Sequence, residues 1–420
     1  MSTGSTDEHG LPMSTVSDWA KDFDHADPAW AADPFPIWDD LRERCPIAHS
    51  DRYNGVYLPT RHEDIAAIAH DTEHFTSKVV LVSNAIVEGD GPIGPAPPIT
   101  SDPPYHQYAR RALLPPFSPR AIESLRPATR QLCEALLDKL EVDVAGGRDV
   151  VDAADEYAGN IPPAVIAEML GLPLEDGALF RKFIHAVIED VDATAEARGA
   201  AFGELDAYIE KHVADHVANP RDDLISYLLD CEVDGRRLQP GDIVGTVILL
   251  LIAGIDTTWS AIGASLFHLA GHSEDRRRLA ADPSLMTTAT EEFLRAYAPV
   301  TMARIVKEPV EIADVLLEKD QWVLLPFPAA NRDPRVFERA DEVLIDREIN
   351  RHLAFGLGIH RCLGSNLARM ELTVALECWM ARFPEFEIAD PARVRWSGGQ
   401  VRGPRQLPLR ILPRSLDENP

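Results

Sequence analysis

Residues 352–372 read HLAFGLGIHRCLGSNLARMEL and form the most informative segment of the sequence. Cys362 stands between two glycines, just before a strongly helical run. We therefore expect its sulfur at a helix N-terminus, where the helix dipole and free backbone N–H groups stabilise a thiolate, the form that binds metal. Gly356 and Gly358 let the backbone approach a flat cofactor without a Cβ clash. A lone cysteine is more often a buried core thiol, but FGLGIHRCLG fixes seven residue types in ten positions, which favours a ligand.

Composition excludes several classes of function. The chain has 41 Lys and Arg against 68 Asp and Glu, a net charge of −27, which disfavours nucleic acid and anionic membranes as partners. Hydrophobic residues make up 45%, typical of a globular protein. The five cysteines show neither zinc spacing nor a disulfide framework. Since the first residues resemble neither a secretory signal nor a membrane anchor, the sequence predicts a cytoplasmic protein.

Hydrophobic periodicity predicts a mainly α fold with small β-sheets. An Asn54-Gly55 turn between two strand-like arms predicts a hairpin. The apolar run 243–255 is too short and interrupted to span a bilayer comfortably and indicates a buried core helix. We expect three parts: a polar leader (1–34), a single domain (35–412) and a tail (413–420). Helices are expected at 35–44, 62–70, 241–272 and 286–297, and strands at 303–312 and 321–326.

The long apolar helix contains AGIDTT at 253–258. Asp256 and Thr257 are costly inside a buried helix unless they find partners. One interpretation is a local kink, with the threonine bonded to a carbonyl one turn earlier. The other is catalysis, because a hydroxyl fed by a carboxylate delivers protons into a pocket that excludes water.

The Cys362 loop resembles the haem-binding loop of the cytochrome P-450 superfamily. AGIDTT, EEFLR at 291–295, NRDP at 331–334 and the Cys loop occur in the family's order, so the resemblance covers about 35–412. It implies the bacterial soluble class, with a long distal helix, a proximal Cys loop, and haem b (iron protoporphyrin IX) bound by Cys362, whose electron donation favours O–O cleavage. One departure is that residues 313–325 lack the proline and glycine that the family commonly places before this strand.

The resemblance assigns roles at matching positions. Thr257 is expected to hydrogen-bond bound oxygen, and Asp256 to relay protons to it. Glu292 and Arg295 are expected to pair with Arg347 as structural residues. The cofactor-binding residues expected to hold the haem propionates are His106, Arg110, Arg304 and His360. Alone, the spacing of His106 and Arg110 is more typical of a solvated helix face.

The implied function is a monooxygenase that inserts one oxygen atom from O2 into a hydrophobic small organic substrate. Because the sequence holds no flavin or iron–sulfur module, electrons are expected from a ferredoxin and an NAD(P)H-dependent ferredoxin reductase. A cluster of arginines would form the docking patch: Arg111, Arg120, Arg126, Arg130, Arg361 and Arg369. The alternatives are a peroxide-dependent haem-thiolate oxidase and a non-catalytic haem-binding protein. The protein is expected to be a monomer.

The same resemblance suggests which segments line the substrate pocket, while the substrate itself stays open. A terpene, an aromatic, a fatty and a steroid-like compound remain equal alternatives. The helices of 180–208 are expected to form a lid. The expected lining comprises 78–89, Ile252, Ala253 and 299–302.

Overall fold

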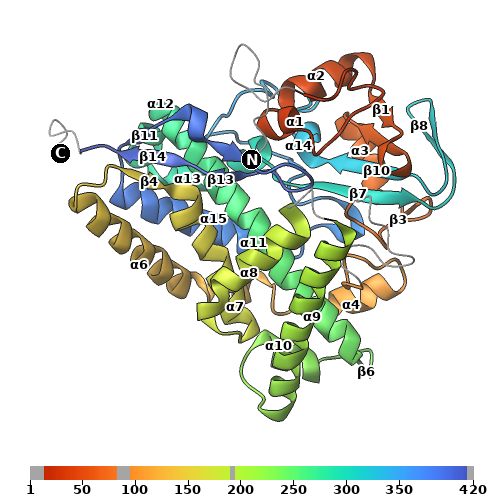
Figure 1. The fold of residues 1–420 in the computed structure, drawn as a ribbon, viewed down its shortest axis with the longest axis horizontal. Coiled ribbons are helices and arrows are strands. Elements are labelled where there is room, and N and C mark those ends of the chain that lie inside the picture. The colour runs from red at the N-terminus through yellow and green to blue at the C-terminus, as the bar shows by residue number, and fades with distance from the viewer. Residues whose placement is uncertain (1–13, 83–94, 190–193, 414–420) are drawn as a thin grey trace.

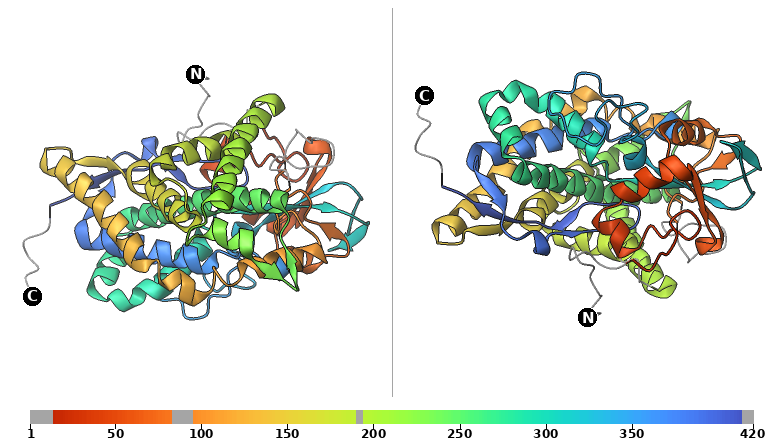
Figure 2. Two further views of the ribbon diagram at one scale, coloured as in Figure 1. Left: turned by 90° about the horizontal axis from the view of Figure 1, so that it is seen from below. Right: turned by 90° about the horizontal axis from the view of Figure 1, so that it is seen from above.

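The computed structural model describes residues 14–82, 95–189 and 194–413 and confirms the mainly α fold with small sheets (Figure 1). Helix α11 (Pro240–Gly271) runs diagonally through the middle of the molecule. Helices α7 (Ile161–Leu170) and α15 (Ser365–Arg382) pack directly against it. The views in Figure 2 place α11 inside the molecule, with the N-terminal helices and α6 (Arg126–Ala145) toward opposite ends. The fold is thus organised around one buried helix.

Helix α11 is apolar on nearly every side, which is why it is buried. By length and composition it is the one helix in the described ranges that is able to cross a membrane, but 83% of its most apolar window is covered by other parts of the protein. It is a core helix. The other α-helices are α1 (Pro28–Ala32), α2 (Phe35–Arg44), α3 (His62–His70), α4 (Tyr105–Leu113), α5 (Pro119–Glu123), α8 (Gly177–Ile184), α9 (Ala195–Ala218), α10 (Leu224–Asp230), α12 (Ser273–Ala281), α13 (Met286–Ala296) and α14 (Phe327–Ala330).

A five-stranded sheet, ordered β1-β2-β10-β7-β3, lies beside the N-terminal helices. The predicted hairpin joins β1 to β2, and Gly55 at its turn has φ +94°, a conformation that favours glycine. Strand β7 begins two residues before the predicted Ala303, because it pairs along its length with β10. The strands are β1 (Ile47–Ser50), β2 (Val56–Pro59), β3 (Phe75–Thr76), β7 (Thr301–Val306) and β10 (Trp322–Pro326).

The remaining strands form small sheets. Among them, β8 (Val310–Ile312) and β9 (Val315–Leu317) make a hairpin in the segment that departs from the family pattern. Its turn is closed by Ala313 and Asp314, both at positive φ (+48° and +62°), where a glycine would avoid the steric cost. The others are β4 (Val150–Asp152), β5 (Glu232–Val233), β6 (Arg236–Arg237), β11 (Phe386–Ile388), β12 (Arg395–Trp396), β13 (Pro404–Gln406) and β14 (Pro408–Ile411).

The segment before residue 35 contributes to the core. Phe23 and Trp30 are buried there. Arg402, near the other end of the chain, donates hydrogen bonds to the carbonyl oxygens of Ala31 (2.8 Å) and Ala32 (2.7 Å). The packed domain therefore begins before residue 35, the boundary expected from the sequence.

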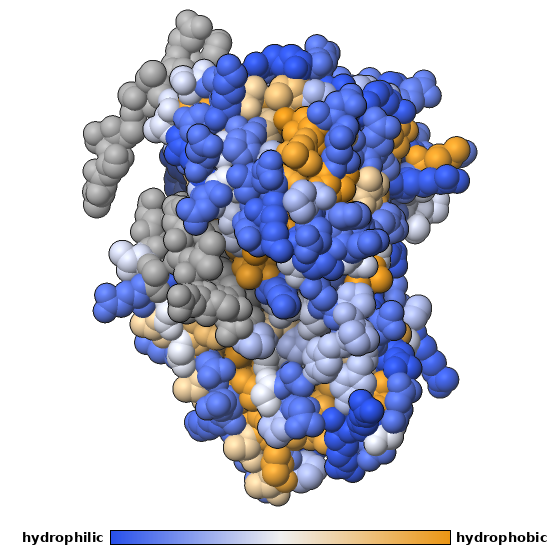
Figure 3. All heavy atoms as spheres, turned by 90° about the vertical axis from the view of Figure 1, so that its right-hand side faces the viewer, coloured by the Kyte–Doolittle hydropathy of each residue, from blue (hydrophilic) through white to orange (hydrophobic). Residues whose placement is uncertain are grey.

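The face shown in Figure 3 is predominantly hydrophilic with separate apolar areas.

The three residues expected to form a structural network do meet. Glu292 and Arg295 are fully buried and joined by two hydrogen bonds of 2.8 Å each. Arg347 Nε donates to the same carboxylate at 2.9 Å. Arg295 also donates to the carbonyl oxygens of Asn331 and Ala340, each at 2.8 Å. The network joins α13 to the segment preceding the Cys362 loop.

Replacing Arg295 by leucine is predicted to lower the free energy of unfolding by ~3–5 kcal/mol, because it leaves the buried Glu292 carboxylate short of positive charge. Chemical denaturation measures the loss. The exposed pair of Arg237 and Glu232, 3.2 Å apart, provides the control, since Arg237→Leu should cost less than ~1 kcal/mol. Equal losses for the two variants would contradict the structural role.

Candidate active site

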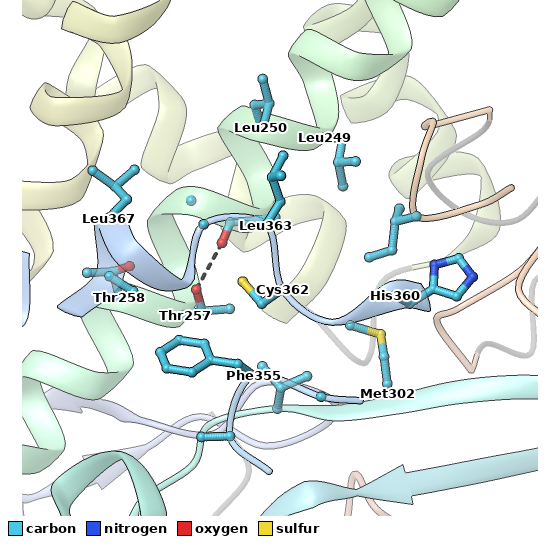
Figure 4. A pocket seen from close by; sticks show the side chains of 18 of the residues that line it. Leu249, Leu250, Thr257, Thr258, Met302, Phe355, His360, Cys362, Leu363 and Leu367 are labelled. Atoms are coloured by element: carbon cyan, nitrogen blue, oxygen red, sulfur yellow. Dashed lines mark hydrogen bonds between the residues drawn. The ribbon is translucent and has the colours of Figure 1, made fainter. Parts of the chain in front are cut away.

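A mainly apolar cavity lies between the middle of α11 and the loop that carries Cys362 (Figure 4). From α11 it is lined by Ala253, Gly254 and Thr257, and from the loop by Phe355 and Cys362. Ala253 lies midway along the buried helix but is exposed, because it faces the cavity. The two motifs singled out in the sequence therefore face one cavity.

The Cys362 loop is held by its own backbone. The Cys362 N–H donates to the Phe355 carbonyl at 2.7 Å, which closes the loop. Gly358 has φ +65°, and a Cβ there would lie 2.6 Å from the carbonyl oxygen of Ala69, so only glycine fits. Helix α15 starts at Ser365, three residues after the cysteine, which confirms the predicted placement near a helix N-terminus.

The Cys362 side chain is exposed to this cavity and is otherwise surrounded by protein. Burial raises the pKa of the Cys362 thiol, because it disfavours the charged thiolate. The backbone N–H of Gly364 and the nearby guanidinium groups of Arg110, Arg361 and Arg369 act in the opposite direction. The site thus supplies hydrogen bonding and positive charge for a thiolate, and a bound metal ion would complete the stabilisation.

Two histidines lie together at the edge of the cavity. The rings of His106, on α4, and His360, in the Cys loop, have centroids 4.4 Å apart. His106 is 1% exposed, and neither of its ring nitrogens has a hydrogen-bond partner within the described ranges. A buried polar group without a partner is costly, which indicates a ligand group at this position.

Two arginines border the same edge of the cavity. Arg304, on β7, is buried and donates to the carbonyl oxygen of its neighbour Ala303 at 2.7 Å. Arg110 donates to the carbonyl oxygen of Arg361 at 2.6 Å. All four residues expected to bind the propionates therefore line the cavity.

The positive charge of this cluster is only partly balanced, by Asp102 nearby. Burial lowers the pKa of Arg304 to about 10. Burial, together with Arg304, His106 and Arg110, lowers the pKa of His360 to about 2. No acidic side chain lines the cavity in the parts of the chain that the structure describes. A flat apolar ligand with two carboxylates beside the cations and a metal above Cys362 fits this arrangement, as haem does.

Thr257 lines the cavity, whereas Asp256 lies on another face of α11. The Thr257 hydroxyl donates to the carbonyl oxygen of Ala253 at 2.9 Å, the bond to the preceding turn that the sequence left open. Asp256 is 1% exposed and forms an ion pair with Arg405 of β13. Arg405 also donates to Ser260 Oγ at 3.0 Å. No motif in the sequence pointed to Arg405.

A sequence profile described as cytochrome P450 matches residues 178–282 and 281–391. The chain is also 32% identical over 393 residues to the polyketide biosynthesis cytochrome P450 PksS of Bacillus subtilis strain 168, covering 90% of this chain and 96% of that protein. The chain belongs to the cytochrome P450 family. The crystal structure of PksS superimposes with a TM-score of 0.83 at 30% identity, covering 93% of this P450 and all of that chain.

Other relatives are named for the oxidations they perform. The vitamin D(3) 25-hydroxylase of Pseudonocardia autotrophica is 34% identical, over 91% of this chain and 94% of its own. The mycinamicin IV hydroxylase/epoxidase of Micromonospora griseorubida is 32% identical, over 89% and 94%. The protein is accordingly a cytochrome P450 monooxygenase, and the family implies a haem-thiolate cofactor.

The predicted docking arginines are mostly paired with acids. Arg111 pairs with Asp234, Arg126 with Glu123, Arg130 with Glu377 and Arg369 with Glu291. Arg120 and Arg361 are exposed. The net positive charge of the patch is therefore smaller than the count of arginines suggests.

Part of the expected substrate lining is present. Ala253, Pro299, Val300 and Met302 line the cavity, whereas Ile252 is buried beside it. Of the expected loop 78–89, residues 78–82 do not line the cavity, and residues 83–89 lie outside the described residues.

Arg304→Leu is predicted to weaken haem retention, because a charge-assisted hydrogen bond contributes ~1.5–3 kcal/mol, which corresponds to roughly tenfold or more in the rate of haem loss. Transfer of haem to excess apomyoglobin measures this rate. Arg277→Leu, on the exposed face of α12, is the control and should leave the rate unchanged. Unaltered haem loss in Arg304→Leu would exclude Arg304 as a propionate ligand.

Proposed function

We propose that this P450 binds haem b through the Cys362 thiolate and hydroxylates a hydrophobic small organic substrate. The observation that carries the proposal is the pairing, across one cavity, of a cysteine loop and the Thr257 region of α11. His106, Arg110, Arg304 and His360 would hold the propionates. When bound, haem supplies the reduction of O2 with two electrons and two protons, so that one oxygen atom enters the substrate and the other leaves as water.

The chain's own task is to supply protons while excluding bulk water. A threonine hydroxyl has one donor hydrogen and two acceptor lone pairs. With its hydrogen on the Ala253 carbonyl, Thr257 presents its lone pairs toward the cavity and must rotate to donate there. We assign Asp256 as the acid that resupplies it. Because Arg405 holds this carboxylate on another face of α11, the relay requires Asp256 to leave that pair transiently.

The substrate is proposed to be predominantly apolar. On the side of α11 the cavity presents Leu249, Leu250 and Ala253, and from β7 it presents Met302. Apolar walls with few polar groups select ligands mainly by shape and burial. The names of the relatives given above support a substrate of about the size of vitamin D(3) or mycinamicin IV. A screen of such compounds and fatty acids by the optical shift of the ferric haem would identify the class.

Electrons are proposed to come from a ferredoxin and its NAD(P)H-dependent reductase. The exposed Arg120 and Arg361 remain the strongest candidates for contact with an acidic ferredoxin. We further propose a monomer in the cytoplasm, in keeping with five cysteines that form no disulfide.

The ferrous carbon-monoxide adduct tests the central proposal. Wild-type protein should show the red-displaced band typical of thiolate coordination, and Cys362→His should lose it because an imidazole cannot donate charge as a thiolate does. Cys45→Ala is the matched control and should retain the band, since Cys45 lies outside the cavity lining. A wild-type spectrum without this band would overturn the proposal.

Thr257→Ala is predicted to lower the yield of product per electron pair roughly tenfold or more, with hydrogen peroxide formed instead, because general acid catalysis contributes factors of that order and above. Ser265→Ala is a matched control. Ser265 lies on the same helix, donates to the carbonyl one turn earlier at 2.8 Å and does not line the cavity. If both variants keep wild-type coupling, Thr257 has no part in proton delivery.

A further inference from the structure

Arg369 of α15 points inward to a carboxylate. Its Nε lies 2.5 Å from Glu291 Oε1 and its Nη2 lies 2.8 Å from Glu291 Oε2. Both side chains are less than a third exposed, at 30% and 28%. This two-pronged contact is the strongest form of arginine–carboxylate pair. Arg369 is therefore committed within the protein, whereas the sequence suggested a docking role for it.

The same guanidinium lies over the ring of Phe355. Its central carbon is 4.4 Å from the ring centroid, within the range of a cation–π contact. Phe355 lines the cavity, and its carbonyl accepts the Cys362 N–H at 2.7 Å. Figure 4 shows its ring beside the Cys362 side chain. Arg369 thus fixes the ring that borders the sulfur.

His352 fixes the acidic partner of this pair. The Ala354 N–H donates to His352 Nδ1 at 3.2 Å, so the ring proton is on Nε2 and is donated to Glu291 at 3.1 Å. Burial alone would raise the pKa of Glu291, but hydrogen bonds from Arg369 and His352 hold it at about 2. The carboxylate is therefore ionised near neutral pH, so the pair carries one charge of each sign.

The positive member of the pair acts on the sulfur. The guanidinium of Arg369 lies 4.4 Å from the centroid of the Phe355 ring, and the carbonyl of Phe355 accepts the Cys362 N–H, so this charge acts on the sulfur at short range. A positive charge near the sulfur stabilises its negative charge. It thereby reduces the electron density that the sulfur donates to a metal. The negative charge of Glu291 has the opposite effect on the sulfur.

We propose that the ion pair of Arg369 and Glu291, stacked on Phe355, sets the reduction potential of the iron bound by Cys362. The inference rests on the proposed function, in which Cys362 ligates haem. Reduction adds one negative charge to the iron site, so a nearby cation favours the reduced state and a nearby anion disfavours it. Arg369 and Glu291 are positioning residues, since they act through Phe355 and the sulfur.

The test measures the midpoint potential of the ferric–ferrous couple by spectroelectrochemistry, without ferredoxin. Arg369→Gln leaves the Glu291 charge uncompensated, and the ratio of ferrous to ferric haem at a fixed potential should fall about tenfold, which is about 59 mV for one electron. Glu291→Gln should shift the potential in the opposite direction. The double variant should return close to wild type. Damage to packing alone would move both single variants in the same direction.

Two further variants complete the design. Arg369→Lys keeps the charge and should retain most of the wild-type potential. Arg382→Gln removes the same charge from the same helix, ~20 Å further along it, where Arg382 pairs with Glu134 and Asp138. It should leave the potential unchanged.

Three outcomes would overturn the inference while the function stands. They are an unmoved potential in Arg369→Gln, shifts of the same sign in both single variants, and an equal shift in Arg382→Gln. If Arg369→Gln slows reduction by ferredoxin but leaves the midpoint potential unchanged, Arg369 contributes to docking instead. In each case the carbon-monoxide band of the wild type must show thiolate coordination. Its absence would instead reject the proposed function.

Discussion

A negatively charged sulfur inside a protein is the constraint on which this architecture depends. Removing a thiolate from water is unfavourable, and burial of Cys362 has that effect on its thiol. The fold compensates with a backbone N–H from Gly364 and with guanidinium groups brought in from α4, the Cys loop and α15. The glycine-rich turn, the helix that follows and the network around Glu292 all serve to keep this one atom in place.

The opposite wall of the cavity is an apolar helix that carries two polar groups. Helix α11 is apolar nearly throughout, yet it carries Asp256 and Thr257 at its middle. The fold satisfies these two polar groups in different ways: the hydroxyl is bonded within its own helix, and the carboxylate is neutralised by Arg405. Both groups have partners at rest, and each would have to leave its partner to deliver a proton as proposed.

Local patterns predicted local structure well. The helices at 35–44 and 62–70 have the expected bounds. The helix at 240–271 begins and ends one residue earlier than expected, and the helix at 286–296 ends one residue earlier, because periodicity and proline define helices within short segments. The motifs also indicated that Cys362, Thr257 and the four residues expected to hold the propionates face one cavity. The pairing of Asp256 with Arg405, and of Arg369 with Glu291, joins residues 149 and 78 positions apart and follows from tertiary packing. No periodicity carries that information, so counting arginines overstated the charge available for docking.

The position of Arg405 has a consequence for protein engineering. This arginine belongs to β13, in a part of the chain that is easily treated as peripheral scaffold, yet it contacts the acid of the distal helix. Directed-evolution libraries restricted to the cavity walls would leave it untouched. Including the C-terminal strands would vary the charge beside Asp256 without changing the residues that line the cavity.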